Sequence, residues 1–192
     1  KLRGMLAYDG GAQHVNGFAA RKDRALKNME DPARVFAGMK AAGLNTEIFS
    51  GGGTGTYGVQ HLTPGFTDVQ VGSYLFMDRD YAENECDASH SHFEHALFVL
   101  TQIMSVGPDR AVVDAGHKSH AIDSGLPRVH DPAGRRRFAF ENGGDEHGIL
   151  RPLDGAPLPG LGETIWLIPG HCDPTVNLYD RYVGIRGGLV DG

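Results

Sequence analysis

Hydrophobic and polar positions along the first eighty residues follow a strand, helix, strand order. A short apolar run at residues 3–8 ends in the glycine-rich stretch DGGAQH, which predicts a buried strand feeding a loop. Apolar residues then recur at helical spacing over residues 18–42, and Pro32 predicts a break within that helix. Further strands are predicted within residues 43–57, where a second glycine loop follows, and over residues 67–78. This order is typical of a parallel α/β sheet or barrel.

The pattern changes after Asp80. Short apolar runs separated by Pro and Gly turns are typical of an antiparallel β domain. A polar stretch at residues 81–91 separates the two patterns, so the sequence predicts an α/β domain at residues 1–80 and a β domain at residues 81–192. The apolar runs of the second domain lie at residues 95–106, 110–116, 137–150, 163–171 and 181–190.

Composition narrows the class of protein. No run approaches the ~20 apolar residues that span a bilayer, and the first residues carry no signal-peptide pattern. The net charge is -6, and the basic residues are scattered apart from three consecutive arginines at 135–137, which argues against a nucleic-acid surface. Two cysteines are too few for a disulfide framework. We therefore expect a cytoplasmic globular protein that binds neither nucleic acid nor membrane.

Two loops of small residues are candidates for binding an anion. The stretch SGGGTGT at residues 50–56 follows a predicted strand, and its backbone N–H groups could face a phosphate. It lacks the lysine of a P-loop and the glycine spacing of a dinucleotide fingerprint, so nucleotide binding is disfavoured. Gly72 and Ser73, near the end of another strand, could contact the same anion. Plain glycine turns are an equally good interpretation of both loops.

The segment GHCDP, residues 170–174, places a histidine, a thiol and a carboxylate side by side. In an extended segment His171 and Asp173 project to one face, and Cys172 points the other way. Imidazole with carboxylate suits Mn²⁺ or Mg²⁺, and so few ligands would leave positions open for water and substrate. The alternatives are a His-Asp hydrogen bond that orients a turn, or a cap by Asp173 of the helix that follows.

Three other polar residues have weaker claims to a site. His14 lies just beyond a predicted strand end, where barrel enzymes keep catalytic groups, although a lone loop histidine is usually solvated. The segment at residues 145–148 groups two carboxylates with His147 and is interpreted as a surface turn. Lys118 lies in a polar stretch and is expected to face solvent.

Five motifs occur in an order that resembles a known enzyme group. They resemble the later part of D-threonine aldolases and D-3-hydroxyaspartate aldolases, which share a group with eukaryotic-type D-serine dehydratases. The resemblance implies an α/β plus β fold: the later part of an alanine-racemase-like (β/α)₈ barrel at residues 1–80, then a D-serine-dehydratase-like antiparallel β domain at residues 81–192 that carries the metal ligands. The motifs are EIFSGGGTGTY (47–57), VGSYLFMD (71–78), VVDAGHKS (112–119), DEHG (145–148) and IPGHCDPTVNLYD (168–180).

The resemblance implies pyridoxal 5'-phosphate as cofactor, with a divalent metal, Mn²⁺ or Mg²⁺, beside it. It implies His171 and Asp173 as metal ligands; the dehydratase branch carries a cysteine at the place of Asp173 and uses zinc, whereas Cys172 is one position out of register. His14 matches the candidate catalytic base of the family. The residues implied to bind the cofactor are Tyr8 and Gln13 along its ring, and Gly53, Thr54, Gly72 and Ser73 around its phosphate.

The family's cofactor-binding lysine lies in the first barrel strand, and this sequence holds no such segment. Lys118, in the predicted β domain, is no substitute. We therefore expect a fragment, inactive by itself, of a homodimeric aldolase that cleaves D-threonine or D-3-hydroxyaspartate to glycine and an aldehyde or glyoxylate. The alternatives are a D-serine-dehydratase-like ammonia-lyase, which Asp173 disfavours, and a non-catalytic metal-binding β module.

Overall fold

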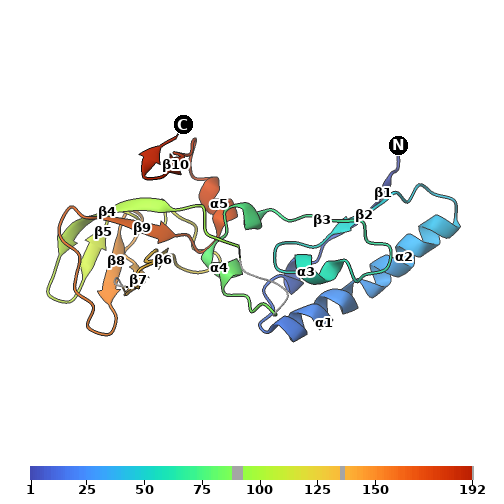
Figure 1. The fold of residues 1–192 in the computed structure, drawn as a ribbon, viewed down its shortest axis with the longest axis horizontal. Helices are drawn as coiled ribbons and strands as arrows, with labels where there is room; N and C mark the ends of the chain where they lie inside the picture. Colours follow the sequence, from blue (N-terminus) through green and yellow to red (C-terminus); the bar gives the residue numbers. More distant parts are fainter. Residues whose placement is uncertain (88–92, 135–136, 192) are drawn as a thin grey trace. The chain divides into compact units, whose positions relative to one another are not determined.

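The computed structural model describes residues 1–87, 93–134 and 137–191. It divides into two compact units, Lys1–Ala96 and Leu97–Gly192 (Figure 1). This division lies later in the chain than the boundary predicted after residue 80, because Asn84 still belongs to the first unit: its amide donates to the Gln13 carbonyl at 2.9 Å. Part of the predicted linker and two of the three consecutive arginines lie outside the described residues.

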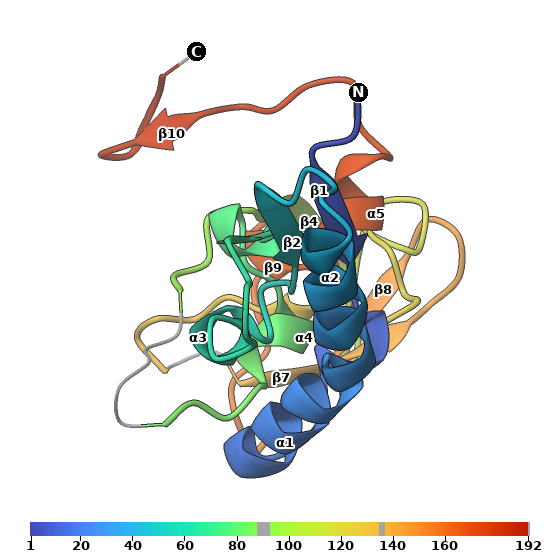
Figure 2. The ribbon, with the colours of Figure 1, turned by 90° about the vertical axis from the view of Figure 1, so that its right-hand side faces the viewer.

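The first unit contains a parallel three-stranded sheet, so the predicted α/β pattern is confirmed. Strand β2 (Ile48–Gly51) lies between β1 (Gly4–Ala7) and β3 (Asp68–Val69). Between the first two strands the chain forms α1 (Phe18–Asn28) and α2 (Glu30–Ala41), which run nearly end to end in Figures 1 and 2. The shorter elements of this unit are η1 (Gly10–Ala12), α3 (Tyr57–Gln60), η2 (Ser73–Leu75) and α4 (Arg79–Ala82).

Two details of the first unit refine the prediction. The helix breaks at Met29, which leaves Pro32 in the first turn of α2, where its missing N–H breaks no helical hydrogen bond. The strand predicted over residues 67–78 is wrong beyond Val69. There the Tyr74 amide donates to the Thr54 hydroxyl at 3.2 Å, and the chain turns into η2 instead of extending the sheet.

The second unit is built on an antiparallel sheet, as predicted. Its described part has six strands in the order β6-β9-β4-β5-β8-β7. Side chains alternate along β4 (Val99–Val106): Val99 and Ile103 enter the core, whereas Leu100 stays exposed. The other elements are β5 (Ala111–Val113), β6 (Arg128–Val129), β7 (Phe138–Asn142), β8 (Gly148–Pro152), β9 (Thr164–Ile168), α5 (Cys172–Val176) and the hairpin of β10 (Ile185–Arg186) and β11 (Leu189–Val190).

Within the described residues, no helix has both the length and the apolar character that crossing a bilayer requires.

A fully buried histidine lies in the core of the second unit. The ring of His120 meets the ring of Phe140 edge-on, with centroids 5.3 Å apart. Its Nδ1 lies 3.4 Å from the Ala121 carbonyl oxygen, and its Nε2 has no hydrogen-bond partner among the described residues. Burial lowers the pKa of this imidazole below its usual value, because the charged form would lose its hydration.

We therefore expect the second unit to lose stability as the pH falls below about 6.5, the usual pKa of histidine. Below that pH the unfolded chain binds a proton on His120 that the folded chain excludes, so the free energy of unfolding falls by up to about 1.4 kcal/mol per pH unit from this residue. Urea unfolding followed by fluorescence of Trp166, the only tryptophan, reports this unit. His120→Leu should flatten the pH dependence, whereas His61→Leu, at an exposed position, should leave it unchanged. Equal slopes in wild type and His120→Leu would contradict the assignment.

Candidate functional site

The loop after β2 is clamped by Gln13, from the loop after β1. The Gln13 side chain is buried, and its Nε2 donates to the Asp9 carbonyl at 3.0 Å and to the Thr56 hydroxyl at 3.1 Å. Its Oε1 accepts the Gly55 amide at 3.0 Å. A side chain at Gly55 would come within 2.0 Å of the Gln13 carbonyl oxygen, so glycine is required for this approach. Both polar ends of the Gln13 side chain are therefore engaged in holding the glycine loop.

The two predicted anion-binding loops meet in the first unit. The Thr54 hydroxyl accepts the Tyr74 amide at 3.2 Å, which joins the loop after β2 to η2. Thr54 and Ser73 are both buried. Among the described residues, apart from Gly72 itself and its two chain neighbours, no atom lies within 4 Å of the position that a Cβ atom at Gly72 would take. Small hydroxyl residues beside open space fit a phosphate group, so these residues suit the phosphate of the predicted cofactor.

Tyr8 approaches the same loop from the end of β1. Its hydroxyl lies within 2.5 Å of where a Cβ atom at Gly53 would stand, so a side chain at this position would displace the Tyr8 hydroxyl. The Tyr8 side chain is half exposed. The structure thus brings Tyr8, Gln13, Gly53 and Thr54 to one place, although they lie in two separate stretches of sequence.

His14 lies beside two residues of α4. Its Nδ1 is 3.3 Å from Asp80 Oδ2, and its ring centroid is 4.4 Å from that of Tyr81. About a third of the His14 side chain is exposed, so solvent or a ligand can reach it. Sequence reasoning did not single out Asp80, because nothing in the local pattern distinguishes it from other helix-initiating acids.

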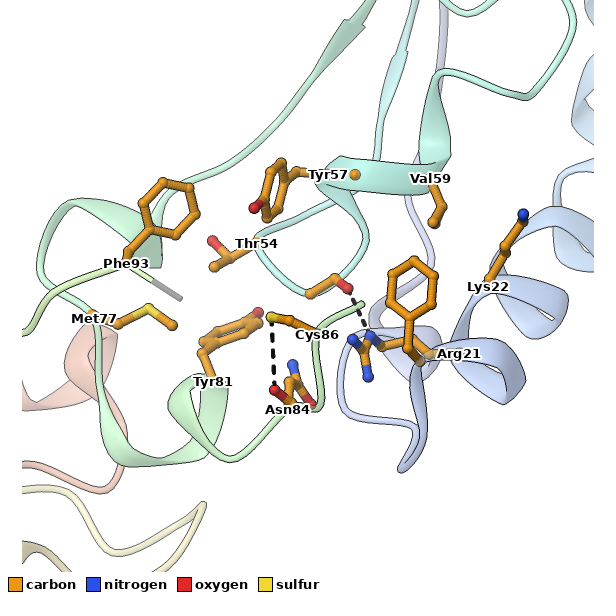
Figure 3. Close-up of a pocket in the computed structure, with 13 residues that line it drawn as sticks. Arg21, Lys22, Thr54, Tyr57, Val59, Met77, Tyr81, Asn84, Cys86 and Phe93 are labelled. Carbon is orange, nitrogen blue, oxygen red and sulfur yellow. Dashed lines mark hydrogen bonds between the residues drawn. The ribbon is translucent and has the colours of Figure 1, made fainter. Parts of the chain in front are cut away.

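A small pocket lies next to these residues (Figure 3). Its volume is about 30 Å³, enough for one or two water molecules but too small for an amino acid. One wall contains Arg21, whose guanidinium donates to the carbonyls of Gly55 and Val15. The pocket also contacts Thr54, from the glycine loop, and Tyr81, which packs on His14.

The second unit brings His171 and Asp173 together. His171 Nε2 lies 4.0 Å from Asp173 Oδ2. Helix α5 begins at Cys172, so the extended geometry assumed for this segment is wrong. The Cys172 side chain is fully buried and its thiol donates to Asp173 Oδ1 at 3.2 Å, so it contacts the carboxylate instead of pointing away from it.

Asp123 is a neighbour of His171 that sequence reasoning missed. Asp123 Oδ2 lies 2.7 Å from His171 Nδ1, and the Ser124 hydroxyl lies 3.3 Å from the same nitrogen. The pKa of the Asp123 carboxyl lies below its usual value: partial burial would raise it, but hydrogen bonds from His171, from the backbone and from Ser124 outweigh that effect. No motif in this loop signals the contact, which joins residues 48 positions apart.

The donor types of His171 and Asp173 suit a divalent ion. Two bonds of about 2.0–2.2 Å to one ion reach across the 4.0 Å between His171 Nε2 and Asp173 Oδ2 only at a wide nitrogen–metal–oxygen angle, so binding at a narrower angle would draw the two atoms together. A histidine whose other nitrogen donates to a carboxylate is the usual arrangement of a metal ligand. Within the described residues, no three His, Cys, Asp or Glu side chains gather closely enough to surround an ion.

Lys118 and the DEHG turn form a surface cluster. The Lys118 ammonium lies 3.2 Å from Glu146 Oε1 and 3.4 Å from Asp145 Oδ2. Hydrogen bonds to these two carboxylates raise the pKa of Lys118 above its usual value. His147 is exposed in the same turn, and the predicted solvent-facing positions are confirmed.

Comparison with known proteins gives matches along the whole chain. Residues 96–185 match the family described as a putative serine dehydratase domain. The 3-hydroxy-D-aspartate aldolase of Paracoccus denitrificans (strain Pd 1222) is 39% identical over 99% of this chain and 49% of its own length. The D-threonine aldolase of Arthrobacter sp. is 38% identical over 98% of this chain and 49% of its own length. The chain thus spans about half the length of these relatives.

Solved structures show similarity to the same kinds of enzyme. The D-threonine aldolase from Filomicrobium marinum is 42% identical, with a TM-score of 0.88 over 97% of this chain and 49% of that one. The D-threo-3-hydroxyaspartate dehydratase from Delftia sp. HT23 is 26% identical, with a TM-score of 0.82 over 100% of this chain and 55% of that one. An alanine racemase-like protein from Idiomarina loihiensis, 21% identical with a TM-score of 0.70 over 92% of this chain and 51% of that one, shows the fold alone. The predicted alanine-racemase-like fold class is confirmed.

Proposed function

The chain belongs to the family of the D-threonine and 3-hydroxy-D-aspartate aldolases, and from that premise we propose that it serves a pyridoxal-phosphate- and divalent-metal-dependent aldolase. Its substrates would be D-3-hydroxy amino acids such as D-threonine or D-3-hydroxyaspartate, cleaved to glycine and an aldehyde or glyoxylate. The observation that carries the proposal is the approach of the Asp173 carboxylate to the imidazole of His171, in a chain that matches aldolases throughout.

The first unit would hold the cofactor. Thr54 and Ser73, with Gly53 and Gly72 beside them, would bind its phosphate, and Tyr8 would lie against its ring. The Gln13 clamp would keep the glycine loop in shape for this contact. When bound, pyridoxal phosphate supplies an electron sink for the Cα–Cβ bond that breaks.

His14 would act as the general base. In retro-aldol cleavage the β-hydroxyl of the substrate loses its proton as the Cα–Cβ bond breaks. Because His14 Nδ1 faces Asp80, its Nε2 is the nitrogen left to receive that proton. A divalent ion held by His171 and Asp173 would supply a Lewis acid that makes a bound hydroxyl more acidic.

A dehydratase is the second candidate, because the dehydratase from Delftia sp. matches the entire chain. Asp173 argues against it. A carboxylate with an imidazole suits Mn²⁺ or Mg²⁺, whereas the zinc of the dehydratase branch calls for a thiolate at that place.

The reaction products formed by the protein that carries this chain distinguish an aldolase from a dehydratase. Incubated with D-threonine or D-3-hydroxyaspartate, pyridoxal phosphate and Mn²⁺, it should release glycine together with an equal amount of acetaldehyde or glyoxylate. L-threonine, of opposite configuration at Cα, serves as control and should give none. Ammonia and a keto acid without glycine would show a dehydratase and contradict the proposal.

A further inference from the structure

A segment far from His171 in sequence is fastened to the stretch of chain that holds His171 and α5. Residues 119–124, here called the fastening segment, are held at three points to residues 171–179. The ties are the Tyr179 hydroxyl to the Ser119 carbonyl at 2.7 Å, the Ala121 amide to the Thr175 hydroxyl at 3.0 Å, and Asp123 Oδ2 to His171 Nδ1 at 2.7 Å.

The middle tie reaches the backbone of His171 itself. Thr175 is buried, and its hydroxyl donates to the His171 carbonyl at 2.6 Å while it accepts the Ala121 amide. The fastening segment is therefore joined to His171 through its backbone as well as through its ring.

Glycine permits this close approach. A Cβ atom at Gly170, the residue before His171, would come within 2.1 Å of the Gly125 carbonyl oxygen. Gly125, just after the fastening segment, has φ +109°, a conformation that other residues rarely adopt. The approach of the segment to His171 thus depends on both glycines.

Each ring nitrogen of His171 faces a different carboxylate. Nδ1 faces Asp123, and Nε2 faces Asp173. A neutral imidazole carries one N–H, and the hydrogen bond on one nitrogen decides which tautomer forms. Donation from Nδ1 to the Asp123 carboxylate leaves the lone pair on Nε2, the form that a metal requires.

We propose that Asp123 is the positioning residue of His171, fixing the Nδ1–H tautomer and the ring orientation that present Nε2 to a divalent ion shared with Asp173. The inference rests on the proposed metal-dependent function. Ser124, with a longer 3.3 Å contact to the same nitrogen, contributes little, because a neutral hydroxyl is a weaker partner than a carboxylate.

Metal affinity is the first test. Titration of the metal-free chain with Mn²⁺, followed by electron paramagnetic resonance of the free ion, should show that Asp123→Ala weakens binding about 10-fold to 100-fold. Asp123→Asn, which keeps the shape of the side chain, should weaken it less. Two controls should bind like wild type: Ser124→Ala, and Asp109→Asn, which removes a carboxylate paired with Arg151 on the surface of the same unit. Unchanged affinity in Asp123→Ala would overturn the inference.

The tautomer is the second test and needs no metal. Long-range ¹H–¹⁵N correlation spectra of the metal-free chain should show His171 protonated on Nδ1 in wild type and shifted toward Nε2 in Asp123→Ala. An Nε2–H tautomer in wild type would overturn the inference whatever the metal affinity. Failure of wild type to bind Mn²⁺ would instead contradict the metal-dependent function proposed above, so the two failures are distinguishable. Unchanged Trp166 fluorescence would show that each variant has folded.

Discussion

Replacement of His171 or Asp173 by alanine is expected to reduce Mn²⁺ binding by well over 100-fold. Each variant removes one of the two proposed metal ligands, whose nearest side-chain nitrogen and oxygen lie 4.0 Å apart. Loss of a mere supporting partner typically costs ~10-fold to 100-fold in metal affinity, so loss of a ligand should cost more. Calorimetric titration of the metal-free chain measures the effect directly.

Cys172→Ser is the matched control. Cys172 lies between the two proposed ligands in sequence, and its thiol donates to Asp173 Oδ1. Serine keeps a donor at that place, so Mn²⁺ affinity should change little. A loss as large as that of His171→Ala would make Cys172 a ligand and would point to zinc instead.

His14→Ala, in the protein that carries this chain, is expected to lower kcat for cleavage of D-threonine by roughly 10²- to 10⁴-fold, the usual contribution of a general base. The proton leaves the β-hydroxyl only as the bond breaks, so the loss should appear in kcat and leave KM nearly unchanged. Steady-state kinetics at saturating Mn²⁺ separates the two parameters.

Two comparisons isolate the imidazole from its surroundings. Added imidazole should restore part of the rate of His14→Ala by entering the space of the missing ring beside Tyr81. His61→Ala, at an exposed position in the same unit, should behave as wild type. An unchanged kcat in His14→Ala would remove His14 from the catalytic site and leave it a solvated loop residue.

The kinds and order of the secondary structure elements could be read from the sequence. The helical spacing over residues 18–42 and the short apolar runs after residue 95 record which faces are buried, and burial follows the period of the local backbone. Both halves of the fold were predicted in this way. Prediction failed beyond Val69, where β3 ends and the chain turns into η2. There the Tyr74 amide binds the Thr54 hydroxyl, a contact between separate segments that the local pattern does not record.

The same distinction between local patterns and distant contacts holds for the candidate site. Residue types and spacing single out His14, the glycine loop and the pair of His171 and Asp173. These could be found from the sequence because the residues of a motif are neighbours in the chain and their side-chain chemistry is known from their type. The sequence by itself also determined the resemblance to the aldolases, since the order of motifs along a chain can be compared without knowing how the chain folds.

Only the tertiary structure decided which side chains support that chemistry. The use of Gln13 as a clamp, the place of Asp80 beside His14 and the bond of Asp123 to His171 all join separate segments. Such partners carry no local signal, because a carboxylate 48 residues away is brought within 2.7 Å by the course of the intervening strands. The turn of the chain into α5 likewise set the direction of Cys172, which the alternation of an extended strand had misplaced.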